Sequence, residues 1–479
     1  MKREVDLSRE VGYRLLLSRT KRSPKSVAYL DETGFKTFFQ LHEDCLRFAR
    51  MMEAVGVKSS ESIAFRGNAY FQMVAFYACS YLGAVSAQIA TPNPSAHDLQ
   101  IYSCLFLEHG FPIRGSKDWK SVDLAKLPPR RPTNAPFLPK AQDGLRIVFS
   151  SGTSGDPKPM LVSYGVMQSR ISDHEDSLSR RDRLHSFFGS ATMLGSYHLI
   201  YVVRSGDARI EAKSATWLAE TLKARKINAL QASPLAAEGF MKDLQKLKIR
   251  PFKIHRIYLT GGWISEELES TLAGFYESEI VVDYGASEVG KVARRIGARS
   301  TPWDSGKVSK SVAVEIVGED QQMVKAGDKG RVRITTPAMV DGYLLENSSN
   351  SFLDGYFYPG DTASLSADGS LQIFGREGSV ANLSGVKIDL EKIETFARGV
   401  LDLESPIAFA FKSKSGVMKL GLCFQGESGM DLDSLASSLR MKFGRGAPQD
   451  FISVARAPLT PSGKPDRQAL AAHLENQHD

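Results

Sequence analysis

The feature that most constrains the fold is an alternation of short apolar runs with longer helical segments. Ser62–Phe65 and Val85–Ile89 are apolar runs of strand length, and the mostly apolar Ala69–Leu82 between them has the length of a helix that ends at Gly83. Similar runs return in the middle of the chain at Ala229–Ala232, Ile257–Thr260 and Glu279–Tyr284. Strands that alternate with helices are typical of α/β layers around a largely parallel sheet. The sequence therefore predicts an α/β fold.

The texture of the sequence changes from Lys329 onward, where short strands and turns replace this alternation. Two glycines in Gly375-Arg376-Glu377-Gly378 favour a hinge. The α+β region that follows has roughly 100 residues, which is enough for a modest core of its own. We expect an N-terminal domain at 1–374, a hinge at 375–378 and a C-terminal domain at 379–479.

A loop rich in glycine and hydroxyl groups follows the apolar run 145–149. Glycine lets the backbone approach an anion closely, while N–H groups, hydroxyls and a lysine supply donors and charge, so the loop suits a polyphosphate. Asp156 and Pro157 separate the second glycine from the lysine, which excludes the common nucleoside-triphosphate P-loop. A flexible surface loop is the alternative. The residues concerned are Ser150, Ser151, Gly152, Thr153, Ser154, Gly155 and Lys158.

The run Glu279–Tyr284 leads directly into Asp283-Tyr284-Gly285-Ala286-Ser287-Glu288. Ligands of α/β sheets bind at the carboxyl ends of the strands. An aromatic ring, a glycine, a hydroxyl and a carboxylate in succession suit a nucleotide site with Mg²⁺, which prefers oxygen ligands. The alternative is a strand-end turn with an ordinary exposed glutamate.

Composition excludes several classes of protein. The chain has 479 residues, of which 42% are hydrophobic, as in a globular protein of two or more domains. No apolar run approaches the ~20 residues that span a bilayer, and no apolar segment of a secretory signal follows Met1. The cysteines lie far apart without metal or disulfide spacing, so we expect reduced thiols and a cytoplasmic protein.

The net charge of +7 is mildly basic. An anionic small-molecule substrate or an acidic partner explains this bias as well as a solvated surface does. Nucleic-acid binding is disfavoured, because the cations are spread through the chain without an aromatic and basic stripe.

Five motifs in a fixed order resemble those of the adenylate-forming superfamily, which includes acyl-CoA synthetases, adenylation domains of peptide synthetases and firefly luciferase. They are the loop at 150–158, Tyr-Gly-x-Ser-Glu at 284–288, Gly-Asp at 360–361, Gly-Arg at 375–376 and Ser-Gly-Lys-x-Asp-Arg at 462–467. The resemblance implies a large N-terminal α/β domain and a small C-terminal α+β lid joined by a hinge. It also implies that ATP and Mg²⁺ activate a carboxylic acid to an acyl-adenylate with release of pyrophosphate. Most members then pass the acyl group to the phosphopantetheine thiol of CoA or of a carrier protein.

The resemblance also implies roles for the matching residues. The loop residues 150–158 would hold the β- and γ-phosphates, Ser287 would contact the α-phosphate, and Glu288 would hold Mg²⁺. Lys464 would reach both the α-phosphate and the attacking carboxylate. The adenine and ribose side of the site would involve Gly261, Gly262, Asp283, Tyr284, Gly285, Asp361 and Arg376, and Gly385 would line the pantetheine tunnel.

Some positions depart from the superfamily pattern. Pro359 replaces the threonine of Thr-Gly-Asp, Gly378 occupies a hinge position where a charged residue is common, and Asn382 replaces a frequent lysine. Because the phosphate donors and Asp361 remain, these departures bear more on thiol transfer than on adenylation. Two alternatives stay open: a catalytically weak or silent homologue that binds nucleotide or acyl groups, and transfer to an amine or hydroxyl acceptor.

The acyl pocket is expected to be built from 187–196, 231–235, 260–263 and 284–290. Amino-acid-activating members place an aspartate in the first of these segments, and here this segment has no acidic residue. A substrate ammonium buried there without a partner would be costly, so we expect an uncharged acyl or aryl acid. Trp263 would shorten the pocket if it points inward, and otherwise it only packs. The cations Arg440, Lys442 and Arg445 would meet CoA phosphates or an acidic carrier protein, or they are solvated helix-end charges.

Overall fold

The computed structural model describes residues 10–90, 99–111, 119–150, 158–177, 182–262, 264, 266–301, 303–345, 351–376, 380–383, 386–399, 403–413, 418–426, 431–460 and 465–477. The chain divides into two compact units. The first unit comprises 1–150, 158–314 and 334–357, and the second comprises 151–157, 315–333 and 358–479. Strands β16 (Ala313–Val317) and β17 (Gly330–Thr335) contain two of the points at which the chain passes from one unit to the other.

A mostly parallel sheet in the first unit contains the strands predicted at 62–65 and 85–89. Its members are β3 (Ser62–Arg66), β4 (Val85–Gln88), β5 (Cys104–Glu108), β6 (Trp119–Val122), β7 (Gly144–Ser150) and β8 (Lys158–Ser163). The strand order is β6-β5-β3-β4-β7-β8, and β8 runs antiparallel to β7 whereas the other neighbours are parallel. This arrangement confirms the predicted α/β layers.

Helix α3 (Ala69–Leu82) has the predicted bounds and is buried along nearly its whole length. Asn68 caps its first turn, because the side chain accepts a hydrogen bond from the Phe71 N–H group. Gly83 ends the helix with φ of 74°, in the left-handed region that favours glycine. The two ends of this apolar helix are thus defined by its own neighbouring residues, Asn68 and Gly83, and do not depend on tertiary contacts.

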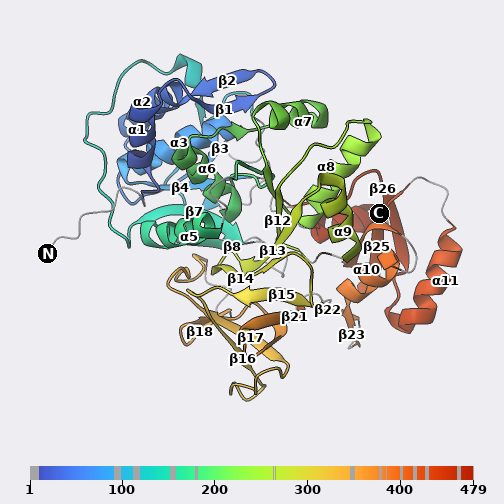
Figure 1. Ribbon diagram of the computed structural model, residues 1–479. Helices are drawn as coiled ribbons and strands as arrows, with labels where there is room; N and C mark the ends of the chain where they lie inside the picture. Colours follow the sequence, from blue (N-terminus) through green and yellow to red (C-terminus); the bar gives the residue numbers. More distant parts are fainter. Residues whose placement is uncertain are drawn as a thin grey trace. The chain divides into compact units, whose positions relative to one another are not determined.

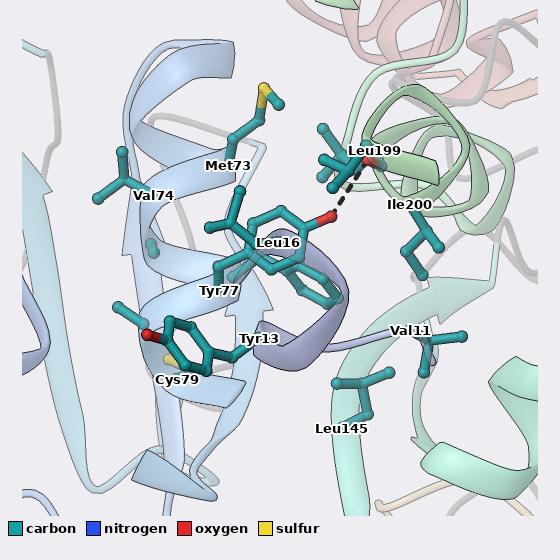
Figure 2. Packing of buried hydrophobic residues seen from close by; sticks show 14 of the residues in the cluster. Val11, Tyr13, Leu16, Met73, Val74, Tyr77, Cys79, Leu145, Leu199 and Ile200 are labelled. Carbon is teal, nitrogen blue, oxygen red and sulfur yellow. Dashed lines mark hydrogen bonds between the residues drawn. The ribbon is translucent and has the colours of Figure 1, made fainter. Parts of the chain in front are cut away.

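The core of the first unit forms around α3. Figure 2 shows Tyr77 of α3 beside α6 (Met193–Ser205), with the Tyr77 hydroxyl donating to the Leu199 carbonyl at 3.3 Å. Further elements that contribute to this core are α1 (Tyr13–Arg22), β1 (Val27–Asp31), α2 (Phe38–Ala54) and α5 (Tyr164–Ser177). Strand β1 pairs with β2 (Gly34–Thr37) and with β10 (Arg209–Ile210).

A second set of parallel strands in the first unit carries the middle part of the sequence. These strands are β9 (Leu184–Ser186), β11 (Ala229–Ala232), β12 (Arg256–Thr260) and β13 (Glu279–Ala286), followed by the antiparallel β14 (Gly290–Ile296) and β15 (Asp304–Val308). Helices α7 (Ala215–Ala224), α8 (Pro234–Lys246) and α9 (Glu266–Tyr276) join them, and α8 and α9 lie beside β12 and β13 (Figure 1). Because the strands are parallel, their carboxyl ends meet at one edge of the sheet.

Strand β13 is longer than predicted. It continues through Tyr284 to Ala286 and forms a hairpin with β14. A Cβ atom at Gly285 would lie 2.3 Å from the Gly290 carbonyl oxygen, so only glycine permits this close pairing. The hairpin turn therefore falls on Ser287, Glu288 and Val289.

In the second unit, β20 (Asp361–Leu365) and β21 (Ser370–Arg376) form the hairpin predicted around Asp368-Gly369. The following elements are β22 (Val380–Leu383), β23 (Val386–Asp389), α10 (Leu390–Gly399), β24 (Glu404–Lys412), β25 (Met418–Gln425), α11 (Leu432–Phe443), β26 (Asp450–Val454) and α12 (Arg467–Gln477). Strands β24, β25 and β26 pair in that order, which gives the predicted α+β texture. Hinge residues 377 and 378 lie outside the described residues, and the domain limits stay a prediction.

Within the part of the chain that the structure describes, no helix combines the length and apolar character needed to cross a bilayer.

Candidate active site

The predicted phosphate loop is closed at its base by β7 and β8. Ser150, which is buried, lies directly opposite Lys158 in the antiparallel register, so the chain leaves and returns at adjacent points. Ser151, Gly152, Thr153, Ser154 and Gly155 lie outside the described residues. The two described ends of the loop, Ser150 and Lys158, are thus cross-strand neighbours.

A buried arginine holds the backbone of the predicted phosphate and metal residues. Arg170 on α5 is 3% exposed and donates hydrogen bonds to the Ser287 and Glu288 carbonyl oxygens at 2.8 and 2.7 Å. Its Nε donates to the Ala338 carbonyl at 2.8 Å. Since an unpaired buried guanidinium is costly, these bonds fix the turn between β13 and β14 against the segment around Ala338.

The Glu288 carboxylate is buried and meets the side chain of Tyr343. The Tyr343 hydroxyl donates to Glu288 Oε1 at 2.6 Å, and the Lys158 ammonium lies 5.0 Å from the centroid of the Tyr343 ring. Burial and the nearby Glu288 charge raise the pKa of Tyr343, so its hydroxyl stays a donor. Lys158 and Glu288, which belong to separate motifs, therefore flank one aromatic side chain.

The predicted adenine residues lie at neighbouring strand ends. Thr260 is opposite Asp283 in the register of β12 and β13, which places Gly261 and Gly262 beside Asp283 and Tyr284. Arg294 Nε and Nη2 donate to the two Asp283 carboxylate oxygens at 2.6 and 2.7 Å. The Asp283 carboxylate is thus paired with the Arg294 guanidinium. In its predicted role, Asp283 would form part of the wall of the adenine site.

The expected acyl-pocket segments also converge at this sheet edge. The Ser186 hydroxyl donates to the Gln231 side-chain oxygen at 3.0 Å, and the Phe187 N–H donates to the Gln231 carbonyl at 2.9 Å. Buried Arg209 donates to the Phe188 carbonyl at 3.0 Å. These bonds connect the end of β9 with the end of β11 and fix the start of the segment 187–196.

A second buried arginine binds the same segment. Arg146 on β7 donates to the Ser190 carbonyl at 2.6 Å, and its guanidinium lies 5.5 Å from the Phe76 ring centroid. Burial lowers the pKa of Arg146 to about 10, which leaves it charged at neutral pH. The wall of the expected acyl pocket is therefore held by an internal cation. Trp263 lies outside the described residues.

The second unit contains the predicted ribose residues. Asp361 is 7% exposed at the start of β20 and is the cross-strand partner of Arg376 in β21. Lys464 and Gly385 lie outside the described residues. The roles of these four residues stay predictions.

The described residues include a donor that a nucleotide-bound Mg²⁺ ion can use. Among the residues that the structure describes, no three His, Cys, Asp or Glu side chains form a metal-binding group. Mg²⁺ is commonly bound by one or two carboxylates together with substrate phosphates and water. Glu288, a single buried carboxylate near Lys158, has the donor chemistry for this arrangement, in which the ion would neutralise phosphate charge.

Sequence reasoning missed Arg170, Tyr343, Arg146 and Arg209. Arg170, Arg146 and Arg209 bind main-chain carbonyls, which every residue has, so no side-chain pattern marks their partners. Tyr343 lies 55 residues from Glu288 in the sequence, and a lone tyrosine in a loop gives no signal of such a contact.

Comparison with known proteins gives a consistent result. Residues 97–344 match the profile of the family described as AMP-binding enzyme. A D-alanine–D-alanyl carrier protein ligase of Lacticaseibacillus rhamnosus is 23% identical over 508 residues, which cover 95% of this chain and 97% of that protein. One of the linear gramicidin synthase proteins of Brevibacillus parabrevis is 23% identical over 508 residues, covering 96% of this chain and 6% of that protein. The chain likewise spans only 5% of tyrocidine synthase 3 from the same organism.

Solved structures share the fold. The chain is similar to O-succinylbenzoate coenzyme A synthetase of Bacillus subtilis in complex with ATP and magnesium ion, with a TM-score of 0.75 and 18% identity over 95% of this chain and 98% of that one. The complex of the same protein with AMP gives a TM-score of 0.77 at 18% identity, over 95% and 97% of the two chains. This likeness confirms the predicted fold class, with a large N-terminal α/β domain and a smaller C-terminal α+β domain.

Proposed function

Because the chain belongs to the AMP-binding enzyme family, as its motifs predicted, we propose that it is an AMP-forming ligase that activates a carboxylic acid with ATP. A carboxylate oxygen forms a bond to the α-phosphorus, and the bond from that phosphorus to the bridging oxygen breaks as pyrophosphate leaves. The sulfur of a phosphopantetheine thiol then forms a bond to the acyl carbon as the thiol loses its proton. The bond from the acyl carbon to the AMP oxygen breaks, and AMP leaves with the electron pair of that bond. The acyl product is a thioester.

The first step brings two anions together, so positioning and charge neutralisation supply most of the catalysis. In this proposal, Lys158 binds the outer phosphates, Glu288 holds the nucleotide-bound Mg²⁺, and Asp361 accepts the ribose hydroxyls. Lys464 neutralises the charge that develops between the α-phosphate and the acid. Mg²⁺, when bound, reduces the negative charge of the leaving pyrophosphate.

One observation carries the proposal. Tyr343 contacts both the Glu288 carboxylate and the Lys158 ammonium, which come from two separate motifs. An ordinary exposed glutamate and a flexible surface loop were the alternatives for these motifs. Glu288 is only 6% exposed, and the loop ends are paired strands, which favours a built anion and metal site.

For the acid, we propose an uncharged acyl or aryl carboxylate. The segment 187–196 has no acidic residue, and the charged Arg146 binds its backbone at Ser190. A buried substrate ammonium would find no carboxylate from this segment, which disfavours an amino acid. The relative named for D-alanine makes an amino acid the competing candidate.

The test is acid-dependent pyrophosphate exchange with matched acids, such as propionate against alanine and benzoate against phenylalanine. We expect exchange with the acids that lack the amino group. Exchange with the amino acids alone would overturn the proposal of an uncharged acid, while the proposal of an AMP-forming ligase would stand. ATP binding without exchange across a broad panel would indicate the catalytically silent homologue.

For the acceptor, we propose a phosphopantetheine thiol. Similar proteins include one named for a carrier protein and one named for coenzyme A, so both forms of the thiol are candidates. Incubation of the enzyme, ATP and the preferred acid with CoA, with a holo-carrier protein and with amines separates the acceptors. Thioester formation supports the proposal, and amide or ester formation alone contradicts it.

A further inference from the structure

Tyr343 lies on a segment that is tied by its backbone to both predicted ATP motifs. The Val340 N–H donates to the Glu288 carbonyl at 3.0 Å, and the Leu344 N–H donates to the Pro159 carbonyl at 2.8 Å. The segment therefore runs from the turn that carries Glu288 to the strand that begins with Lys158. Neither end is free to move without breaking a main-chain hydrogen bond.

The Tyr343 side chain repeats this connection with its two chemically different parts. The hydroxyl donates to Glu288 Oε1 at 2.6 Å, while the Lys158 ammonium lies 5.0 Å from the ring centroid, within the range of a cation–π contact. The Phe352 ring packs edge-on against Tyr343, with centroids 5.2 Å apart and an interplanar angle of 75°. The contact with Phe352 restricts the orientation of the Tyr343 side chain, which also contacts Glu288 and Lys158.

We propose that Tyr343 is a positioning residue of the ATP site, which orients the Glu288 carboxylate for Mg²⁺ and the Lys158 ammonium for the phosphates. The inference rests on the proposed function and goes beyond it by assigning a role to a residue outside the five motifs. The hydroxyl donates to one carboxylate oxygen, Oε1, and so restricts the orientation of the whole carboxylate. Outer-shell hydrogen bonds of this kind fix metal ligands, and their loss typically costs 10–100-fold in metal affinity or activity.

A tyrosine that only fills the core would make the same packing contacts, so the test must separate the hydroxyl from the ring. Tyr343→Phe keeps the ring for Lys158 and Phe352 and removes only the bond to Glu288. Tyr70→Phe is the matched control, because the Tyr70 hydroxyl donates to Asp44 at the same distance of 2.6 Å. Neither Tyr70 nor Asp44 belongs to the predicted ATP motifs.

Equilibrium binding of a non-hydrolysable ATP analogue is measured by calorimetry, with and without Mg²⁺. For Tyr343→Phe we expect metal-free affinity within about twofold of wild type and a loss of about tenfold in the Mg²⁺-dependent gain. The Mg²⁺ concentration that half-saturates pyrophosphate exchange should rise by a similar factor. Tyr70→Phe should bind with the wild-type Mg²⁺ dependence, even if its melting temperature falls.

A double-mutant cycle with Glu288→Gln tests whether Tyr343 acts through the carboxylate. If it does, Tyr343→Phe adds little to the loss of Mg²⁺ dependence in the Glu288→Gln background. Wild-type Mg²⁺ dependence in Tyr343→Phe, or full additivity with Glu288→Gln, would overturn the positioning role while the ligase proposal stands. A wild-type protein that binds no ATP analogue would overturn the ligase proposal and this inference with it.

Discussion

At the scale of single residues, Arg170 illustrates how one buried cation orders a distant motif. Its guanidinium serves three carbonyls, including those of Ser287 and Glu288. We expect Arg170→Lys to lower the free energy of unfolding by about 1–3 kcal/mol, because an ammonium cannot reach all three acceptors in one plane. Urea unfolding measures this loss. The rate of pyrophosphate exchange should fall by a larger factor than the fraction of folded protein does.

The matched control for Arg170 is Arg209, another buried arginine that serves carbonyls. Arg209→Lys should destabilise the protein to a similar extent, while metal dependence of exchange stays as in wild type. If Arg170→Lys and Arg209→Lys affect exchange and Mg²⁺ dependence identically, Arg170 has no special role in holding the turn.

Another residue-scale effect concerns pH. Burial lowers the pKa of His185 to about 3, with the Arg209 cation as a smaller cause. In the unfolded state, His185 binds a proton below about pH 6.5. In the folded state, His185 stays neutral down to about pH 3. The stability from neutral His185 is complete above pH 6.5 and is lost as pH falls, by up to ~1.4 kcal/mol per pH unit.

We therefore expect His185→Phe to show a shallower decline in the free energy of unfolding between about pH 6.5 and 4.5 than wild type. Urea unfolding at several pH values measures the slope. His255→Gln, which removes an exposed histidine, is the control and should keep the wild-type slope. An unchanged slope in His185→Phe would show that His185 titrates normally.

At the scale of elements, the hairpin of β13 and β14 sets where Ser287 and Glu288 lie. A Cβ at Gly285 would meet the Gly290 carbonyl at 2.3 Å, so Gly285→Ala must push the strands apart. We expect pyrophosphate exchange to fall by about tenfold or more, because even a ~1 Å displacement of site residues is costly. Gly274→Ala in α9, where a Cβ meets open space, should keep full activity, and equal effects of the two variants would refute this reasoning.

At the scale of the whole molecule, the fold class could be predicted from the alternation of apolar runs with helical segments, and the family from five motifs in a fixed order. The bounds of α3 were predicted from its apolar residues and Gly83, since both signals are local. The extension of β13 to Ala286 was not, because it depends on a glycine carbonyl in the next strand. The contacts of Tyr343 were also unpredictable, since they join segments that are distant in sequence and share no pattern.

In the C-terminal part of the chain, Arg467 and Lys464 are expected to separate stability from chemistry. Arg467 Nη2 donates to partly buried Glu394 at 2.6 Å and its Nε donates to the Ala408 carbonyl at 2.8 Å, so Arg467→Ala should destabilise this region. Lys464→Ala should instead unfold at the wild-type urea concentration and bind ATP, yet lose exchange by about 10²–10³-fold, as for removal of a group that stabilises transition-state charge. Wild-type exchange in Lys464→Ala would contradict this role of Lys464. A different cation would then have to neutralise the negative charge of the two reacting anions.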